Sequence, residues 1–351
     1  MIKYIRRSHR DTIFVRSSRG ADIRFTIQND SGYHYKIANK RFTPSLTSMQ
    51  MLLVNMMLRT QFCNRQIKAA CESNIVEGLA RMVYGSNKIA GTGAGFAITR
   101  KLCLKIFRGE DTTRGITQDS EYYALLSEDC IDHSSSDRSV LRSCREIVQH
   151  AKAAVFMIHK LCISNKELSE DFILEAHGIL TSKLYEEETT CAHSSGVYRT
   201  VDVSPGFHTF PAPLLVPLKI KEMIRDMQRD MRQVRKLKRL DPIMLAAKYA
   251  HIFNNIHPFL RGNGRMCRLI LNCLLLKHGC YLICIGEDEK SRKDYLDVVC
   301  AGSQLEATYD GREEEEKPIM HGELASLVLQ HQYRSTKRLL NHIWLEGDSL
   351  I

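Results

Sequence analysis

The stretch HPFLRGNGRMCR, His257–Arg268, carries the strongest structural signal in the chain. Pro258 disfavours helix in the residue before it, so the helical pattern of DPIMLAAKYAHIFNNI is expected to end at or before His257. The segment that follows, RMCRLILNCLLLK, is apolar nearly all round, which is typical of a buried central helix. HPFLRGNG is therefore predicted to be a loop between two helices, the second of which is buried.

The residue types in this loop suit the binding of a phosphate chain beside a base. A helix start offers backbone N–H groups and a positive dipole end, and Gly262 and Gly264 let these groups converge on one anion. Arg265 and Arg268 are three residues apart, so both guanidinium groups can flank the same phosphates. His257 is a residue whose ordinary pKa suits a general base for an incoming hydroxyl. Together these residues indicate transfer of a phosphate-bearing group to an alcohol.

Each of these features has a plainer interpretation when it is taken alone. A histidine before a proline commonly caps a helix or packs in a core, and Gly-Asn-Gly is a common turn. Arginines in the first turn of a helix often serve only as surface charge. The joint spacing of the three features favours the chemical interpretation.

The composition is that of a globular protein outside the membrane. The chain has 351 residues, of which 44% are hydrophobic and 26% charged, enough for one large domain or two ordinary ones. The net charge of +10 permits nucleic-acid binding, but the excess is divided between Met1–Arg41 and Arg225–Arg239, so a nucleic-acid partner is not expected. MIKYIRRSHR lacks the apolar core of a signal peptide, and MLLVNMML is too short to span a bilayer, so no membrane association is expected.

The 12 cysteines are interpreted as reduced thiols. They form no C-x-x-C pair and no cysteine–histidine cluster at zinc spacing, so no metal site is predicted from them. Reduced cysteines are typical of cytosolic and nuclear proteins, and we therefore expect a cytoplasmic or nuclear location.

Helical patterns dominate the chain and predict an all-α fold. One interruption, Tyr198–Pro213, has alternating residues and a Pro-Gly turn, which favours an extended β-hairpin. Four regions follow from these patterns: a basic N-terminal arm at 1–45, an N-terminal helical region at 46–165, a core region around the loop at 166–305, and an acidic loop with a final helix at 306–351.

The stretch His257–Arg268 resembles the signature of Fic-domain proteins, H-P-F-x-[D/E]-G-N-G-R-x-x-R, and matches every fixed position except one. GVYRTVDV (Gly196–Val203) resembles the segment that leads into the family's flap, and FHTFPAP (Phe207–Pro213) follows where the flap would continue. The resemblance covers about Ser169 to Val299. It implies a helical bundle with a small β-hairpin flap, and it makes the core region at 166–305 the Fic domain.

The resemblance also implies an activity and a role for each matching residue. The family's usual reaction moves AMP from ATP onto a Ser, Thr or Tyr hydroxyl of a protein, so ATP is the expected substrate. A protein with an exposed hydroxyl, this chain included, is the expected partner, and whether the protein forms a homodimer stays open. His257 would be the general base and Phe259 a core anchor under the loop. The implied phosphate-binding residues are Gly262, Asn263, Gly264, Arg265 and Arg268, and the implied flap residues, which would align the target by strand addition, are Phe207, His208, Thr209 and Phe210.

The one departure from the signature is Arg261, where the family has Asp or Glu. That carboxylate holds the Mg²⁺ that bridges the ATP phosphates, and a guanidinium offers a hard cation no oxygen ligand. Mg²⁺ is thus expected for the family, while its usual ligand is absent from this chain. Two interpretations stay open: the charge of Arg261 replaces that of the metal, or the site is impaired and the protein is a nucleotide-binding scaffold.

A second family pattern concerns an inhibitory helix, [S/T]-x-x-x-E-[G/N], whose Glu pairs with the second arginine of the signature. SNIVEG (Ser73–Gly78) matches this pattern with Glu77, whereas SNKIAG (Ser86–Gly91) has the same spacing with Ala90 in place of Glu. The segment FAITRKLCLKIFRGE after the second stretch resembles the helix that follows in the family, which favours the second stretch and a lost inhibitory Glu. If Glu77 is the inhibitory residue, its partner is Arg268.

Overall fold

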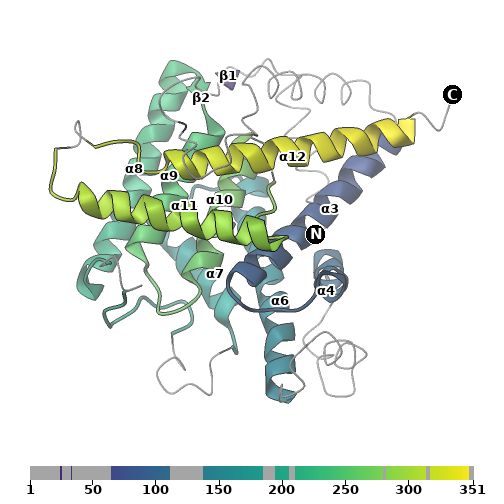
Figure 1. Cartoon of the computed structure of the whole chain (residues 1–351), viewed down its shortest axis with the longest axis horizontal. Helices are drawn as coiled ribbons and strands as arrows, with labels where there is room; N and C mark the ends of the chain where they lie inside the picture. Colours follow the sequence, from purple (N-terminus) through teal and green to yellow (C-terminus); the bar gives the residue numbers. More distant parts are fainter. Residues whose placement is uncertain are drawn as a thin grey trace.

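Helices make up most of the described part of the computed structural model, which comprises residues 24–25, 33, 65–110, 137–184, 194–204, 210–279, 282–313 and 317–347 (Figure 1). The predicted all-α class is confirmed. Within these ranges the strands are two residues long: β1 (Arg24–Phe25) pairs in parallel with β2 (Arg239–Leu240). No helix in the described ranges has both the length and the apolar character needed to cross a membrane.

The helices of the described ranges account for most of those residues, and the longest segments between consecutive helices separate α4 from α6 and α7 from α8. A π-helical turn at His159–Ile163 continues α6, and a 3-10 turn at Pro213–Leu215 leads into α8. In chain order the helices are α3 (Arg65–Ile89), α4 (Phe96–Arg108), α6 (Asp137–Ile158), α7 (Glu170–Thr181), α8 (Val216–Leu237), α9 (Pro242–Ile256), α10 (Asn263–Gly279), α11 (Glu289–Thr308) and α12 (Gly322–Gly347).

Several helix ends are encoded locally. The Ser169 side chain accepts a hydrogen bond from the backbone N–H of Phe172, so this serine caps α7. Asp241 caps α9 in the same way, with Pro242 at the first helical position. Gly109 is the C-cap of α4 in the left-handed conformation, with φ of 83°.

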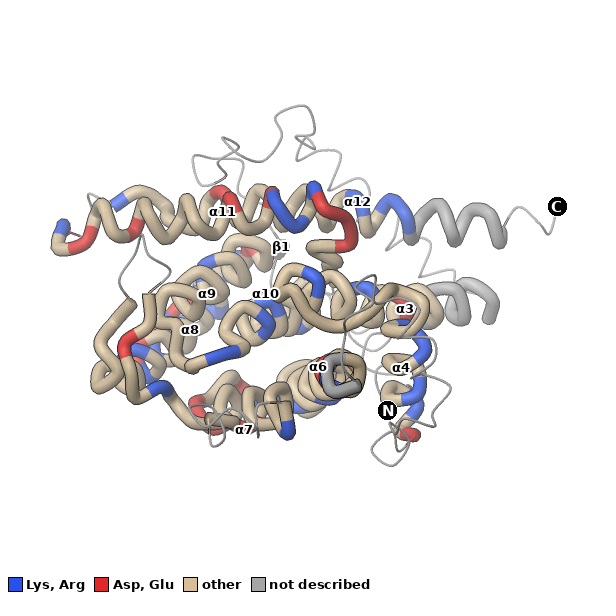
Figure 2. The backbone as a smooth tube through the Cα atoms, turned by 60° about the horizontal axis from the view of Figure 1, so that its bottom comes forward, with Lys and Arg blue, Asp and Glu red and all other residues tan. Residues whose placement is uncertain are grey.

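The α9–α10 pair forms the centre of the molecule. Thirteen of the 17 residues of α10 are buried, which confirms the prediction of a buried central helix. Helices α11 and α12 pack on one side of this pair, while α6 and α7 pack on the other (Figure 2). The loop between α9 and α10 is therefore held inside the bundle at the end of α9 and the start of α10.

The described parts of the expected β-hairpin flap contain no strand. Residues 201–204 and 210–212 are not in strands, and the two ends of this segment are joined by one side chain. The Arg199 guanidinium donates to the carbonyl oxygens of Val201 and Pro211. Three of the expected flap residues, Phe207, His208 and Thr209, lie outside the described residues.

Other predictions also lie wholly or partly outside the described residues. These are most of the basic arm at 1–45, the helical pattern before residue 65, and the centre of the acidic run at 314–316. Within the arm, β1 and Tyr33 are described, and the Tyr33 hydroxyl donates to the Asp241 carboxylate at 2.8 Å. The arm thus contacts the start of α9 at these points.

Candidate active site

Helix α9 ends at His257, as its sequence predicts. His257 is the C-cap of α9 in the left-handed conformation, with φ of 48°, and its backbone N–H donates to the carbonyl of Phe253. The carbonyl of His257 accepts a hydrogen bond of 2.8 Å from Nε of Arg199. The imidazole stacks on the Phe210 ring, with 4.1 Å between centroids. The half-buried imidazole is therefore held in place by the hydrogen bonds of the His257 backbone and by the Phe210 ring stacked on one of its faces.

The loop His257–Gly262, called the signature loop below, is closed by the side chain of Asn263. Its Nδ2 donates to the carbonyl of Phe259 at 2.6 Å, and its Oδ1 accepts from the Phe259 N–H at 2.9 Å. The Phe259 ring is fully buried, as expected of an anchor under the loop. Because both ends of the Asn263 amide hold the loop, only its backbone N–H, in the first turn of α10, can face an anion.

Gly262, at the end of the signature loop, and Gly264, in α10, are glycines for different structural reasons. Gly262 has φ of 81°, and an added Cβ would lie 3.3 Å from Thr181 and 3.4 Å from the His177 ring, so a side chain here would be both strained and crowded. Gly264 lies in the first turn of α10, where an added Cβ would stand 3.2 Å from Nη1 of Arg268. The loop therefore curls tightly over α7 and brings Arg268 close to the helix start.

His177 of α7 supports the loop from beneath, a role that the sequence patterns did not indicate. Its Nε2–H donates to the carbonyl of Arg261 at 2.9 Å, while its Nδ1 accepts from the N–H of Gly196 at 3.0 Å. The imidazole stacks on Phe259, with 3.6 Å between centroids. The pKa of His177 is lowered to about 4, chiefly by burial and also by the charge of Arg265, while the bond to the Arg261 carbonyl opposes the shift. A neutral ring is thus held in one tautomer.

A sequence signal for His177 existed in the pattern of α7. Apolar residues at Ile173, Ala176 and Leu180 place position 177 on the buried face of the helix, and all of these residues are buried. A histidine among them needs hydrogen-bond partners in the core. The partners themselves are 19 and 84 residues away in sequence and could not be inferred from the helix alone.

The two arginines after the loop are buried, unlike the surface charges that the plainer interpretation expected. Arg265 is 3% exposed and Arg268 is 4% exposed. Nε of Arg268 donates to the hydroxyl of Ser86 at 2.8 Å, and its Nη2 donates to the Ser86 carbonyl at 2.7 Å. The guanidinium also lies over the Tyr295 ring. Arg268 therefore sits at the C-terminal end of α3, where the helix dipole favours a cation.

The last turn of α3 is fixed from a second direction by His150 of α6. Nδ1 of this histidine donates to the Asn87 side-chain carbonyl at 2.8 Å, one residue after Ser86. Burial lowers the pKa of His150 well below its ordinary value, and the charges of Arg265 and Arg268 lower it further. A neutral histidine thus lies between α6, the end of α3 and the two arginines.

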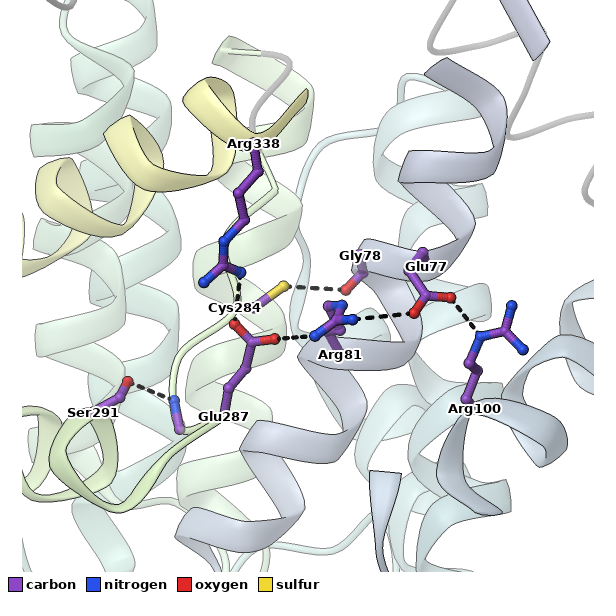
Figure 3. A network of polar contacts seen from close by, with 9 residues as sticks. Glu77, Gly78, Arg81, Arg100, Cys284, Glu287, Ser291 and Arg338 are labelled. Carbon is purple, nitrogen blue, oxygen red and sulfur yellow. Dashed lines mark hydrogen bonds and ion pairs between the residues drawn. The ribbon is translucent and has the colours of Figure 1, made fainter. Parts of the chain in front are cut away.

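Glu77 lies on α3 nine residues before Ser86, about 13 Å along the helix axis. Its carboxylate accepts from Nε of Arg100 at 2.6 Å and pairs with Arg81 at 3.4 Å. Arg81 in turn pairs with Glu287, which also binds Arg338 (Figure 3). The partners of Glu77 in the structure are therefore these arginines and not Arg268.

Of the two candidate inhibitory stretches, only Ser86–Gly91 contacts the signature arginines. Ser86 is buried against Arg268, while Ala90, in place of the family's Glu, is exposed in the turn after α3. The contact to Arg268 therefore comes from a serine hydroxyl and a helix carbonyl.

Arg261 differs from its neighbours in the loop, because its side chain is exposed and its backbone carbonyl makes the contact with His177. The residues around the loop do not fit a magnesium ion, since position 261 offers no oxygen ligand. Within the described ranges, no group of three or more His, Cys, Asp or Glu side chains could hold a metal ion.

Comparisons with known proteins agree with this geometry. Residues 167–275 match the model of the Fic/DOC family. The chain is 40% identical over 86 residues to a Fido domain-containing protein of Dictyostelium discoideum, and 30% identical over 80 residues to a probable protein adenylyltransferase of Aquifex aeolicus. These matches take in 24% and 23% of this chain, and the chain spans 57% and 23% of the length of the two relatives.

The fold is also similar to a solved structure of Fic-1 from C. elegans. The TM-score is 0.59 at 20% sequence identity, and the match covers 85% of this chain and 73% of that one. The buried helix that follows the signature loop, the loop itself and the matching family model lead to one conclusion. Residues 167–275 form a domain that matches the Fic/DOC family, within a chain that has the fold of a Fic protein.

Proposed function

We propose that this protein transfers AMP from ATP to a Ser, Thr or Tyr hydroxyl of a protein, its own hydroxyls included. His257 is the general base. The backbone N–H groups around Gly262, Asn263 and Gly264, together with Arg265 and Arg268, bind the phosphates. The proposal draws support from the match of residues 167–275 to the Fic/DOC family model and from the name of the Aquifex relative, a probable protein adenylyltransferase.

One observation carries the proposal: an oriented histidine stands at the mouth of a helix start that is backed by two buried arginines. His257 is stacked on Phe210 and held through its carbonyl by Arg199. Both arginines are buried in the first two turns of α10, and Nη1 of Arg268 lies close to Gly264, so an anion bound at this helix start would lie near Arg268. A phosphate chain at this helix start is such an anion.

In the proposed step, the oxygen of the target hydroxyl bonds to the α-phosphorus of ATP. The bond from that phosphorus to the oxygen that bridges to the β-phosphate breaks, and pyrophosphate leaves. The hydroxyl proton passes to the His257 imidazole. The guanidinium groups and the N–H groups at the start of α10 offset the negative charge of the leaving pyrophosphate. Arg268 reaches the phosphates by exchanging its contacts with Ser86 for phosphate oxygens.

Position-specific labelling of ATP tests this step. The full chain is incubated with ATP that carries radioactive phosphorus either at the α or at the γ position. AMP transfer labels protein from the α-labelled nucleotide only, and His257→Ala loses the label. Label from the γ position would instead indicate phosphoryl transfer and contradict the proposal. Label that persists in His257→Ala would show that His257 is not the general base.

The exposed Arg261 favours a second candidate function, a nucleotide-binding scaffold that does not transfer AMP. Without a carboxylate at this position, the charge on the phosphates is offset by arginine alone. Equilibrium dialysis with ATP separates the two functions. The scaffold is supported when ATP binds the parent and the binding falls in Arg265→Ala, while no label enters any protein. Incorporation of α-label by the parent protein excludes it.

A further inference from the structure

Arg199 is a buried arginine outside the signature that binds backbone oxygens from three different positions of the chain. The residue is 4% exposed. Its Nε donates to the carbonyl of His257 at 2.8 Å, its Nη1 donates to that of Val201 at 3.2 Å, and its Nη2 donates to that of Pro211. Each of the three guanidinium nitrogens therefore holds a different carbonyl.

The same residue also holds the second position of the signature loop. The backbone N–H of Arg199 donates to the carbonyl of Pro258 at 3.0 Å. Two consecutive carbonyls after α9, those of His257 and Pro258, thus accept hydrogen bonds from one residue. The histidine at the mouth of the site is therefore fixed to Arg199 as well as to its own helix.

His257 needs external support because its backbone lies in an unfavourable region. Its φ is 48°, and a residue with a side chain is strained in the left-handed conformation. Such conformations persist only where the surrounding contacts over-determine them, and they are common at functional sites. The N–H of His257 is bound to Phe253 of α9, so its carbonyl, bound by Arg199, is the second fixed point.

The orientation of the imidazole depends on Arg199 by a second route. The His257 ring stacks on the Phe210 ring, with 11° between the two planes. Phe210 belongs to no helix or strand of the described residues, and the carbonyl of the next residue, Pro211, is bound by Arg199. One guanidinium thus holds both the backbone of His257 and the chain beside the ring that covers its imidazole.

Other contacts keep the chain before Arg199 in place. The N–H of Gly196 donates to the His177 ring, and the Tyr198 hydroxyl donates to Glu170 at the start of α7. These bonds do not involve the Arg199 side chain. We therefore expect a change of this side chain to act on the histidine at the mouth of the site more than on the fold around it.

We propose that Arg199 is a positioning residue, which sets the orientation of the His257 imidazole by binding the carbonyls of His257 and Pro211 with one guanidinium. The proposal rests on the proposed function, in which His257 is the general base. Lysine is not an equivalent residue here, because its ammonium group has a single nitrogen, whereas three nitrogens of a planar fork bind the three carbonyls.

NMR of the full chain without nucleotide tests the proposal. Histidine labelled with ¹³C at Cε1 gives a signal for each of the 14 histidines, and His257→Gln identifies that of His257. The ring current of the stacked Phe210 shifts this signal in the parent, and Phe210→Leu marks its position without the stack. We expect Arg199→Lys to move the His257 signal toward the position seen in Phe210→Leu.

Two controls separate positioning from a general loss of structure. Arg292→Lys removes another arginine that donates to a backbone carbonyl, that of Gly286, and should leave the His257 signal unchanged. The His177 signal, assigned with His177→Gln, reports the packing beneath the signature loop and should stay in place in Arg199→Lys. Arg199→Gln is the second variant, since it leaves no buried charge, and thermal unfolding verifies the folding of both.

Transfer from α-labelled ATP gives the functional readout. We expect Arg199→Lys to lower kcat about a hundredfold, because misplacement of a reacting group by about 1 Å has an effect of this size. ATP binding by equilibrium dialysis should match that of the parent. The carbonyls that Arg199 binds lie outside the start of α10, where the phosphates are proposed to bind.

A His257 signal that stays at the parent position in the folded Arg199 variants would overturn the proposal, and so would transfer at the parent rate. An equal displacement of the His177 signal, or a loss of ATP binding, would also overturn it, since Arg199 would then be a general support of the loop. If the His257 signal moves as expected while the parent transfers no AMP, the proposed function fails and the positioning of His257 by Arg199 stands.

Discussion

The inner and outer sides of the signature loop differ in how closely the fold depends on them. On the inner side, Phe259 is fully buried, His177 and Asn263 are buried, and their side chains form hydrogen bonds or stacks that close the loop. On the outer side, the Arg261 side chain is exposed, and its backbone carbonyl makes the contact with the interior. The same six-residue loop is thus rigidly packed beneath and open above.

This difference explains how the chain departs from the family pattern at one position only. A change in a side chain on the outer side leaves the bonds of the inner side in place, so the loop keeps its conformation with arginine at position 261. What the substitution removes is an oxygen ligand, which is a matter of chemistry at the site. The following predictions test this contrast, from the largest expected effect on stability to the smallest.

The largest loss is expected on the inner side, for Asn263→Ala. The change removes two buried hydrogen bonds to the Phe259 backbone and leaves its N–H and carbonyl without these partners. We expect the free energy of unfolding to fall by about 3 kcal/mol in urea titrations. Arg261→Ala, in the same loop, serves as the matched control and should unfold like the parent. A loss below about 0.5 kcal/mol for Asn263→Ala would refute the proposed closure of the loop.

The next effect is a sensitivity to acid that arises from His177. Its pKa in the folded protein is about 4, below the ordinary 6.5, so the unfolded chain binds the proton first as the pH falls. The stabilisation is therefore complete above about pH 6.5 and is lost progressively between about pH 6.5 and pH 4. Between about pH 7 and pH 5, the parent should lose about 2 kcal/mol more than His177→Gln, which cannot titrate.

Unfolding of both proteins at several pH values measures this difference. The other histidines with lowered pKa values, His150, His321 and His331, are present in both proteins, so their contributions cancel in the comparison. Parallel pH profiles for the parent and the variant would show that His177 is not the neutral support of the loop.

A smaller effect is expected where α3 meets the signature. Ser86→Ala removes the hydroxyl that Arg268 binds and leaves the carbonyl, so stability should fall by about 1 kcal/mol. Because Arg268 is then less firmly held by α3, calorimetry should show tighter ATP binding. Glu77→Ala, on the same helix, should leave ATP affinity unchanged. Tighter ATP binding in Glu77→Ala alone would show that Ser73–Gly78, and not Ser86–Gly91, restrains Arg268.

The smallest effect on stability is expected for Arg261→Asp, which should unfold within about 0.5 kcal/mol of the parent. The new carboxylate supplies an oxygen ligand, so Mg²⁺ should raise the melting temperature of the ATP-bound variant more than that of the ATP-bound parent. An equal rise in both proteins would indicate that position 261 does not face the nucleotide.

The elements that could be predicted from the sequence are those with local causes. Pro258 and Gly109 mark helix ends through their backbone preferences, Ser169 marks one through its side-chain cap, and the apolar pattern of α10 marks a buried helix. The signature predicted the match of residues 167–275 to the Fic/DOC family model and the buried position of Phe259.

The contacts that could not be predicted join distant parts of the chain. Ser73–Gly78 and Ser86–Gly91 have the same spacing, and only the packing of α3 decides that Ser86, 182 residues before Arg268, reaches it. Glu77 has the expected residue type, but the turn on which it lies faces Arg81 and Arg100. Spacing within one helix does not specify which turn faces the site.

The most direct test of the proposed activity is mass spectrometry of the intact protein and its peptides after incubation with ATP and either Mg²⁺ or Mn²⁺. The parent, His257→Ala and Arg261→Asp are compared under identical conditions. We predict that the parent gains the mass of AMP on a Ser, Thr or Tyr and that His257→Ala gains none. An unmodified parent beside a modified Arg261→Asp would contradict the proposed activity of the natural chain, while leaving the fold of the site intact.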